Sequence, residues 1–386
     1  MIYLDNSATT EISAAAKSSM VSAMEAYGNP SSKHRLGIDG RAIIDKARAQ
    51  VASALGAGRV GAENLLFTSC GSEANNMAIL GCLYSKEKRR ANRVITTDSE
   101  HPSVENVMRK IEKDGFEVIR LSTKGGVINP VELDAALNDN VAMVSFMLVN
   151  NETGAVYDLK SLFATVKRKC SDAVTHCDAV QGFMKVPFTV KSLGADMISV
   201  SAHKIHGPKG VGALYISPEI IKMKKIVPYI IGGGQEGGYR SGTENTVGIA
   251  GFGAAAEEAK AAFSANCAKM TALRELCEKK AVEVGARANV PTHNRAPHVL
   301  SLTLPSIKSE TMLNYLSGKG FCVSAGSACS SHSRHISSSL VGFGLTEQEA
   351  DCTIRVSFSE YNTETEVEDF CTALGEGIDS LVRIKK

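Results

Sequence analysis

The chain has 386 residues, of which 44% are hydrophobic and 22% are charged, the balance of an ordinary globular protein. Lys and Arg together number 43 against 41 Asp and Glu, so no strong field indicates a nucleic-acid or anionic-membrane partner. We therefore expect the partners to be small molecules or other proteins, with no nucleic acid and no membrane among them.

The N-terminus and the cysteines bear on the compartment. Residues 1–6 lack the basic segment and apolar stretch of a signal peptide, and no apolar run reaches the ~18 residues of a membrane helix. The ten cysteines include no CxxC pair, and the tightest pairs, Cys170/Cys177 and Cys322/Cys329, are too widely spaced for a zinc knuckle. We expect a cytoplasmic protein with reduced thiols and no metal site.

From about residue 60 to 216, short β-branched runs alternate with helix-like segments. Strands are expected at 65–68, 93–96, 117–121, 141–149, 173–176, 197–200 and 212–216. Helix-like segments lie between several of them, at 72–84, 131–137 and 161–168. This alternation is typical of an α/β fold whose mainly parallel sheet is covered on both faces. Ligands of such sheets bind in loops beyond the carboxyl ends of the strands.

The pattern changes after the glycines at 232–234. Residues 252–284 have the composition and spacing of one or two helices. Strands at 298–304 and 354–359 and a terminal helix at 364–382 are expected to follow. We interpret this region as a second, α+β module, with a Ser- and His-rich loop at 327–339.

A lysine stands at the end of a buried strand, where an ammonium group must be paired or must react. Lys204 closes the sequence SAHK, which directly follows the strand at 197–200. A desolvated lysine forms a Schiff base with an aldehyde cofactor. These four residues by themselves leave open an exposed loop lysine beside the GPKG sequence at 207–210.

Two further segments fit the same cofactor chemistry. Asp178 ends the strand before that of Lys204, and a pyridoxal ring needs a carboxylate that keeps its pyridine nitrogen protonated. Gly71 and Ser72 lie where a strand leads into a helix, and a helix N-terminus can bind a phosphate. Taken alone, Asp178 could also be a helix N-cap, and Ser72 could serve a capping box.

Nine motifs occur in a fixed order along the chain. They are LDNSATT at 4–10, GNPSS at 28–32, EH at 100–101, VNNETG at 149–154, HCDAVQ at 176–181, SAHK at 201–204, GGGQE at 232–236, RSGTEN at 240–245 and SAGSAC at 324–329. Together they resemble the cysteine desulfurases of the class V aminotransferases, and the resemblance covers nearly the whole chain.

The resemblance implies a fold and an activity. The fold would be the pyridoxal-phosphate-dependent transferase fold type I. Its large domain, residues 13–254, would hold a mainly parallel seven-stranded sheet, and its smaller α+β domain, residues 1–12 and 255–386, would carry the Cys329 loop. The enzyme would convert L-cysteine to L-alanine and hold the sulfur as a persulfide on Cys329, for iron–sulfur cluster or thio-cofactor synthesis. A sulfur-acceptor or iron–sulfur scaffold protein would be its partner.

The resemblance also implies roles for single residues. Lys204 would bond the cofactor, Asp178 would face the pyridine nitrogen and His101 would stack on the ring. Asn151 and Gln181 would lie on the side of the phenolic oxygen. The residues implied for the phosphate are Gly71, Ser72, Ser201 and His203, with Thr243 reaching across from the other subunit of a homodimer. Arg355, together with Asn151, would bind the substrate carboxylate, since guanidinium groups bind carboxylates in a bidentate manner.

Cys329 lies in a run of Ser, Gly and Ala without large apolar neighbours. That setting favours a moving loop that carries a nucleophile rather than a buried structural cysteine. A thiol of ordinary pKa, ~8.5, needs proximity or a basic neighbour to activate it, and His101 is one candidate. His332 and His335 are weaker candidates, which we interpret as parts of a solvated loop. Phe321 and Val323 flank Cys322 and indicate a buried strand position there.

Three alternative functions remain beside that of a cysteine desulfurase. A selenocysteine lyase or cysteine sulfinate desulfinase would use the same cofactor residues, whereas a class V aminotransferase would have no use for Cys329 in a loop. A non-catalytic sulfur-trafficking scaffold is the reading from another class of protein. The presence of Lys204, Asp178, His101 and Cys329 together argues against that last reading.

Overall fold

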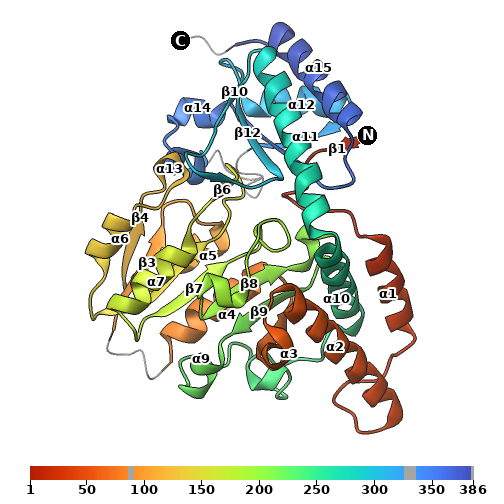
Figure 1. The fold of residues 1–386 in the computed structure, drawn as a ribbon, viewed down its shortest axis with the longest axis vertical. Coiled ribbons are helices and arrows are strands. Elements are labelled where there is room, and N and C mark those ends of the chain that lie inside the picture. The colour runs from red at the N-terminus through yellow and green to blue at the C-terminus, as the bar shows by residue number, and fades with distance from the viewer. Residues whose placement is uncertain (86–90, 326–335, 384–386) are drawn as a thin grey trace.

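A computed structural model describes residues 1–85, 91–325 and 336–383. Its centre is a seven-stranded sheet in the order β2-β9-β8-β7-β5-β3-β4 (Figure 1). The strands are β2 (Leu65–Thr68), β3 (Arg93–Thr97), β4 (Glu117–Leu121), β5 (Val141–Met147), β7 (Val174–Asp178), β8 (Met197–Ser201) and β9 (Gly212–Ile216). β9 runs antiparallel to β2 and β8, and the other pairs are parallel. The prediction of a mainly parallel seven-stranded sheet is confirmed.

Both faces of this sheet are buried, because successive side chains of a strand point to opposite faces. In β2, Leu65 and Phe67 join one apolar core and Leu66 joins another. The first core is covered by α2 (Arg35–Ala54), α7 (Leu159–Lys169) and α10 (Thr246–Ala261). The second core is covered by α4 (Gly71–Leu83), α5 (Pro102–Lys113) and α9 (Pro218–Lys222). The sheet is therefore the middle of three layers.

A second module lies at one end of the molecule, where Figure 1 also shows both chain ends. Its sheet has the order β10-β12-β15-β14, formed by β10 (Arg287–Ala288), β12 (Val299–Thr303), β14 (Ser324–Ala325) and β15 (Thr353–Ser357). The helices α11 (Phe263–Glu283), α12 (Ser309–Gly318) and α15 (Glu364–Ser380) pack with it around a separate apolar core, which Leu4 joins from the N-terminus. β1 (Ile2–Tyr3) pairs in parallel with β13 (Phe321–Cys322). The first residues of the chain thus belong to this module.

The remaining elements are short connections or peripheral helices. They are α1 (Ala14–Met24), α3 (Gly58–Gly61), β6 (Ala155–Val156), α6 (Pro130–Ala136), α8 (Val190–Leu193), β11 (Asn294–Arg295), α13 (Ser338–Phe343) and α14 (Glu347–Asp351). Within the described ranges, no helix has the length and apolar character needed to cross a membrane.

The helices predicted at 252–284 differ from the structure at their start. The structure has two helices there, and α10 begins at Thr246, where the Asn245 side chain accepts a hydrogen bond from the Gly248 N–H. A Cβ on Gly253 would lie 2.6 Å from the Ala47 Cα, so α10 uses small residues to approach α2 closely. Gly248, Gly251 and Gly253 lower the helix propensity of this segment. The sequence pattern therefore did not indicate the first turns of α10.

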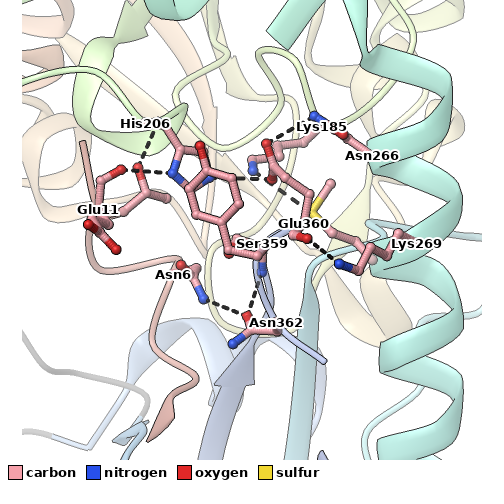
Figure 2. A network of polar contacts seen from close by, with 12 residues as sticks. Asn6, Glu11, Lys185, His206, Asn266, Lys269, Ser359, Glu360 and Asn362 are labelled. Carbon is pink, nitrogen blue, oxygen red and sulfur yellow. Dashed lines mark hydrogen bonds and ion pairs between the residues drawn. The ribbon is translucent and has the colours of Figure 1, made fainter. Parts of the chain in front are cut away.

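The N-terminal segment at residues 5–13 runs from the second module to the loop that carries Lys204. Asp5 pairs with Ser357 beyond the end of β1, and the Thr10 N–H donates to the His203 carbonyl at 2.9 Å. Figure 2 shows the polar network beside it: His206 Nδ1 lies 2.8 Å from the Glu11 carbonyl oxygen, and His206 Nε2 lies 3.3 Å from Glu360 Oε2. The network joins the loop after β8 to the segment after β15.

Burial and charge oppose each other at the centre of that network. Burial disfavours the Glu360 carboxylate, but the bond to His206 and the charge of Lys185 outweigh it and lower the pKa of Glu360 to about 2. Burial lowers the pKa of Lys185. The Asn266 side chain on α11 also donates to Glu360, at 2.9 Å. The carboxylate of Glu360 therefore holds groups from the two modules together.

Candidate active site

A cavity of about 620 Å³ opens at the carboxyl ends of the parallel strands, the place where ligands of such sheets bind. The residues that line it follow β3, β5, β7 and β8, or come from the N-terminus of α4, residues 7–8, residues 336–339 and β15. Ten predicted site residues lie in its wall: Gly71, Ser72, His101, Asn151, Asp178, Gln181, Ser201, His203, Lys204 and Arg355. The structure thus brings together residues that are up to 284 positions apart.

Lys204 closes a short 3-10 turn (Ala202–Lys204) directly after β8. Its Nζ donates hydrogen bonds to the carbonyl oxygens of Ser7 at 2.5 Å and Ala8 at 2.8 Å. The side chain is half-buried and faces the cavity, so the reading as an exposed loop lysine is wrong. Two neutral acceptors hold the ammonium group in reach of a ligand.

Asp178 is the last residue of β7 and is buried. Its Oδ2 accepts a hydrogen bond from Asn75 Nδ2 on α4 at 2.7 Å, and its Oδ1 accepts the Val180 N–H at 3.0 Å. Residues 179–183 form turns rather than a helix, so Asp178 is not a helix N-cap. The carboxylate is oriented by two donors and lines the cavity.

The N-terminus of α4 forms a cradle beside Ser201. Gly71 begins the helix, and a Cβ there would lie 2.7 Å from Val180 Cγ2 and 3.4 Å from Ser201 Cβ. The Ser201 hydroxyl is buried and has no hydrogen-bond partner within the described structure. The N-cap is Cys70, whose Sγ accepts the Glu73 N–H at 3.4 Å, so the capping-box reading of Ser72 is wrong. The helix N-terminus and an orphaned hydroxyl are features of an anion site.

Two histidines near the cavity are held in their neutral forms. Burial lowers the pKa of His101, and the charge of Lys204 adds to this while Asp178 opposes it. His101 Nδ1 accepts the Ser103 N–H at 3.1 Å, so the neutral ring carries its proton on Nε2. Burial, with Lys204 and Lys209, lowers the pKa of His203 to about 4. Neutral rings can pack on an aromatic ligand without adding charge.

Arg355 comes from the second module and reaches the cavity from β15. Its Nη2 donates to Asp5 Oδ1 at 2.8 Å and its Nη1 donates to the Asn151 carbonyl at 3.0 Å. Nε is buried and has no partner among the described residues. The guanidinium group is therefore fixed in direction and keeps donor capacity for an anion in the cavity.

Gln181 and Thr243 lie differently from the other predicted residues. Gln181 Nε2 donates to the Ser7 carbonyl at 2.9 Å and its Oε1 lies 3.1 Å from His298 Nε2, so its amide also holds the N-terminal segment.

Thr243 is exposed and is not in the cavity wall. Arg240, three residues earlier, donates to Glu73 on α4 at 2.8 Å. Cys329, His332 and His335 lie outside the described residues. Cys322 is in a strand, β13, as predicted, but it is only partly buried rather than buried.

Two buried acids in the cavity wall had no predicted role. Burial raises the pKa of Glu100 to about 8 and that of Glu152 to about 7, where Ser337 and Arg355 oppose the rise. Ser337, which caps α13, donates to Glu152 Oε2 at 2.6 Å. Both acids stand in motifs beside predicted residues, Glu100 before His101 and Glu152 after Asn151. Among the residues that the structure covers, no group of three or more His, Cys, Asp and Glu could hold a metal ion.

The fold and the site together define the class of protein. The family model for class V aminotransferases matches residues 2–370, and the chain belongs to that family. Within it the chain belongs with the cysteine desulfurases. Cysteine desulfurase 2 of Trichormus variabilis is 38% identical over 372 residues, which cover 95% of this chain and 90% of that protein.

Solved structures support the same family. A structure titled as a NifS-like protein superposes with a TM-score of 0.91 at 35% identity and covers 98% of this chain and 100% of that one. The structure titled SspA in complex with cysteine superposes with a TM-score of 0.81 at 31% identity, over 94% of this chain and 100% of that one. The resemblance inferred from the nine motifs and the fold type I architecture are confirmed.

Proposed function

We propose that this chain is a pyridoxal-phosphate-dependent cysteine desulfurase that converts L-cysteine to L-alanine and transfers the sulfur to Cys329. The observation that carries the proposal is that one cavity holds Lys204, Asp178 and Arg355. They supply an amine for an aldehyde, a carboxylate for a pyridine nitrogen and a guanidinium group for an α-carboxylate. The named relatives and the cysteine complex of SspA support the choice of substrate.

The residues present fit pyridoxal phosphate. The cavity of about 620 Å³ is within the ~300–1,000 Å³ range of small-molecule sites. The orphaned Ser201 hydroxyl and the α4 N-terminus suit the phosphate, and a Cβ on Gly71 would fill that cradle. Lys204 and Asp178 would hold the aldehyde end and the pyridine nitrogen, with His101 against the ring and Asn151 and Gln181 on the phenolic side. His203 and Ser72 would complete the phosphate site.

Arg355 fits the substrate carboxylate. Asp5 and Asn151 fix two of its amino groups, and the unpartnered Nε leaves an anion a donor on the same guanidinium group. A carboxylate there would relieve a buried, unsatisfied donor, whose cost is about 1–3 kcal/mol. The amine end of the substrate would then lie toward Lys204.

When bound, pyridoxal phosphate supplies an electron sink that stabilises negative charge on the substrate carbon beside the amine. Lys204 would hold the cofactor, and its amine is placed to move the α-proton of the substrate. The Ser7 and Ala8 carbonyls keep its ammonium form in place. The Cys329 thiolate then attacks the substrate sulfur: the new S–S bond forms, the C–S bond breaks and its electron pair stays with the substrate. A proton added to the β-carbon that carried the sulfur, and a proton returned to the α-carbon, give alanine, and Cys329 carries a persulfide for the acceptor.

We infer a homodimer in which Thr243 reaches the phosphate of the other subunit. Ile230 pairs with Arg240 in an isolated bridge, and Tyr229, Ile230 and Ile231 are exposed apolar residues next to the segment that leads to Thr243. An exposed apolar group of this kind is typical of a contact surface. The division into a large domain, residues 13–254, and a small domain, residues 1–12 and 255–386, is supported by the separate apolar cores.

The experiment is an assay of alanine and sulfide with L-cysteine, on the wild type and on Lys204→Ala and Cys329→Ala. Lys204→Ala should lose the borohydride-reducible cofactor, and Cys329→Ala should keep it and lose sulfide release. After a cysteine pulse, mass spectrometry should find one extra sulfur on the Cys329 peptide, with Cys322→Ala as the matched control. L-selenocysteine, cysteine sulfinate and alanine with a keto acid test the alternative activities. Sulfide release by Cys329→Ala at the wild-type rate would contradict the proposal.

A further inference from the structure

One carboxyl group in the cavity wall has no task in the chemistry above. Glu100 stands between β3 and α5, directly before His101, and only 4% of it is exposed. Its Oε1 accepts two hydrogen bonds, from the Thr97 hydroxyl at 2.8 Å and from the Met147 N–H at 3.0 Å. Met147 ends β5, the neighbouring strand. Glu100 thus ties the turn that carries His101 to two strand ends.

The other carboxyl oxygen of Glu100 is unmatched. Oε2 is buried, and no donor reaches it in the part of the chain that the structure describes. A buried carboxylate normally has a cationic partner or several donors. If Oε1 is the carbonyl oxygen and Oε2 carries the proton, one buried hydroxyl lacks a partner among the described residues, which costs less than a buried negative charge on the same atom.

The groups around Glu100 also disfavour its ionised form. Asp178 and Cys177 face it from β7, Glu105 from α5 and Tyr157 from the segment after β6. Each of these groups is neutral or negative, and among the described residues no cation contributes to the pKa of Glu100. Burial raises the pKa of Glu100 to about 8; the hydrogen bonds from Met147 and Thr97 oppose this rise, and the charges of Asp178 and Glu105 add to it. Negative charge at this end of the cavity is therefore concentrated on Asp178.

We propose that Glu100 is a positioning residue that works as a neutral acid, clamping the His101 turn to β5 while leaving Asp178 as the carboxylate that faces the ligand. Loss of the proton would place a second, unpaired negative charge in the wall and repel Asp178. The contacts of Glu100 with Thr97 and Met147 and the distribution of negative charge around Asp178 would then change together. The consequence for turnover rests on the proposed desulfurase function, whereas the protonation state does not.

The first test uses the protein without cofactor. The folded state keeps the Glu100 proton up to about pH 8, whereas the unfolded chain loses it near the ordinary pKa of ~4.3. The folded state binds more protons between those values, so wild-type stability should fall as the pH rises through this window. Glu100→Gln should lack that fall. Its unfolding midpoint relative to wild type should rise from acidic pH to pH 8 and then level off.

The matched control is Glu105→Gln. Glu105 also faces Glu100, but it pairs with Arg109 at 2.8 Å and with Arg120 at 2.9 Å. The unfolding midpoint of Glu105→Gln relative to wild type should therefore show no rise that levels off near pH 8. Parallel pH curves for Glu100→Gln and wild type would show that Glu100 titrates normally, and the proposal would fall.

The second test is the pH profile of kcat with cysteine. Wild-type kcat should fall above about pH 8, and Glu100→Gln should lose that alkaline limb. Glu100→Ala, which has no acceptor for Thr97 and Met147, should lose roughly tenfold in kcat, and the glutamine variant should restore most of it. A glutamine variant as impaired as the alanine variant would overturn the proposal. If wild type has no activity with cysteine, the proposed function fails, and the stability curves still decide the state of Glu100.

Discussion

Gly71 offers a sharp test of the phosphate cradle through the change Gly71→Ala. The added Cβ would stand 2.7 Å from Val180 Cγ2, well inside van der Waals contact. Val180 is β-branched and has few rotamers with which to retreat, so the N-terminal turn of α4 has to move away. Overpacking of this kind costs about 1–3 kcal/mol. Because 1.4 kcal/mol is tenfold in Kd, the Kd for pyridoxal phosphate should rise roughly 5- to 150-fold.

The assay is a titration of the cofactor-free protein with pyridoxal phosphate, followed by absorbance. Gly318→Ala is the matched control, because a Cβ on Gly318 at the end of α12 meets nothing within 4 Å, and its Kd should equal that of wild type. Thermal unfolding of both cofactor-free variants shows whether the fold survives. A wild-type Kd for Gly71→Ala would refute the placement of the phosphate at this helix.

Two further predictions concern Arg355 and Thr243. Arg355→Lys keeps the charge but loses the fork of donors, so the KM for cysteine should rise roughly 10- to 100-fold with a smaller change in kcat; an unchanged KM in steady-state kinetics would exclude Arg355 from the carboxylate site. The wild type should sediment as a dimer at assay concentration, and Thr243→Ala should remain dimeric while its Kd for pyridoxal phosphate rises roughly tenfold; a fully active monomer would contradict the shared site.

Much of the site followed from local patterns. Asp178 ends a short apolar strand and Lys204 follows one within three residues, and strands of that kind separated by helices form a parallel sheet. Their carboxyl ends then meet at one edge, so the two side chains had to come close whatever the loops do. The corresponding strands in the structure begin and end within two residues of the predicted ones, with β5 ending at Met147 rather than at Val149.

Other contacts depend on segments that meet only in the folded chain. The carbonyl oxygens of Ser7 and Ala8 bind Lys204 because the N-terminal segment crosses to the loop after β8. Asp5 orients Arg355 across 350 positions of sequence. Backbone carbonyls carry no sequence signal, since every residue has one, so no motif could have predicted the first of these contacts.

The nine motifs by themselves predicted the fold type, which is confirmed, and they singled out Lys204 and Asp178 as the residues proposed to hold the cofactor, because each motif is a short run of residues. The cap of α4 by Cys70, the early start of α10 and the raised pKa of Glu100 were decided by packing. The ionisation of Glu100 depends on burial between β3, β5 and β7 and on the distance to Asp178. Desolvation and charge are sums over neighbours in space, and neighbours in space are set by the tertiary structure rather than by adjacent residues.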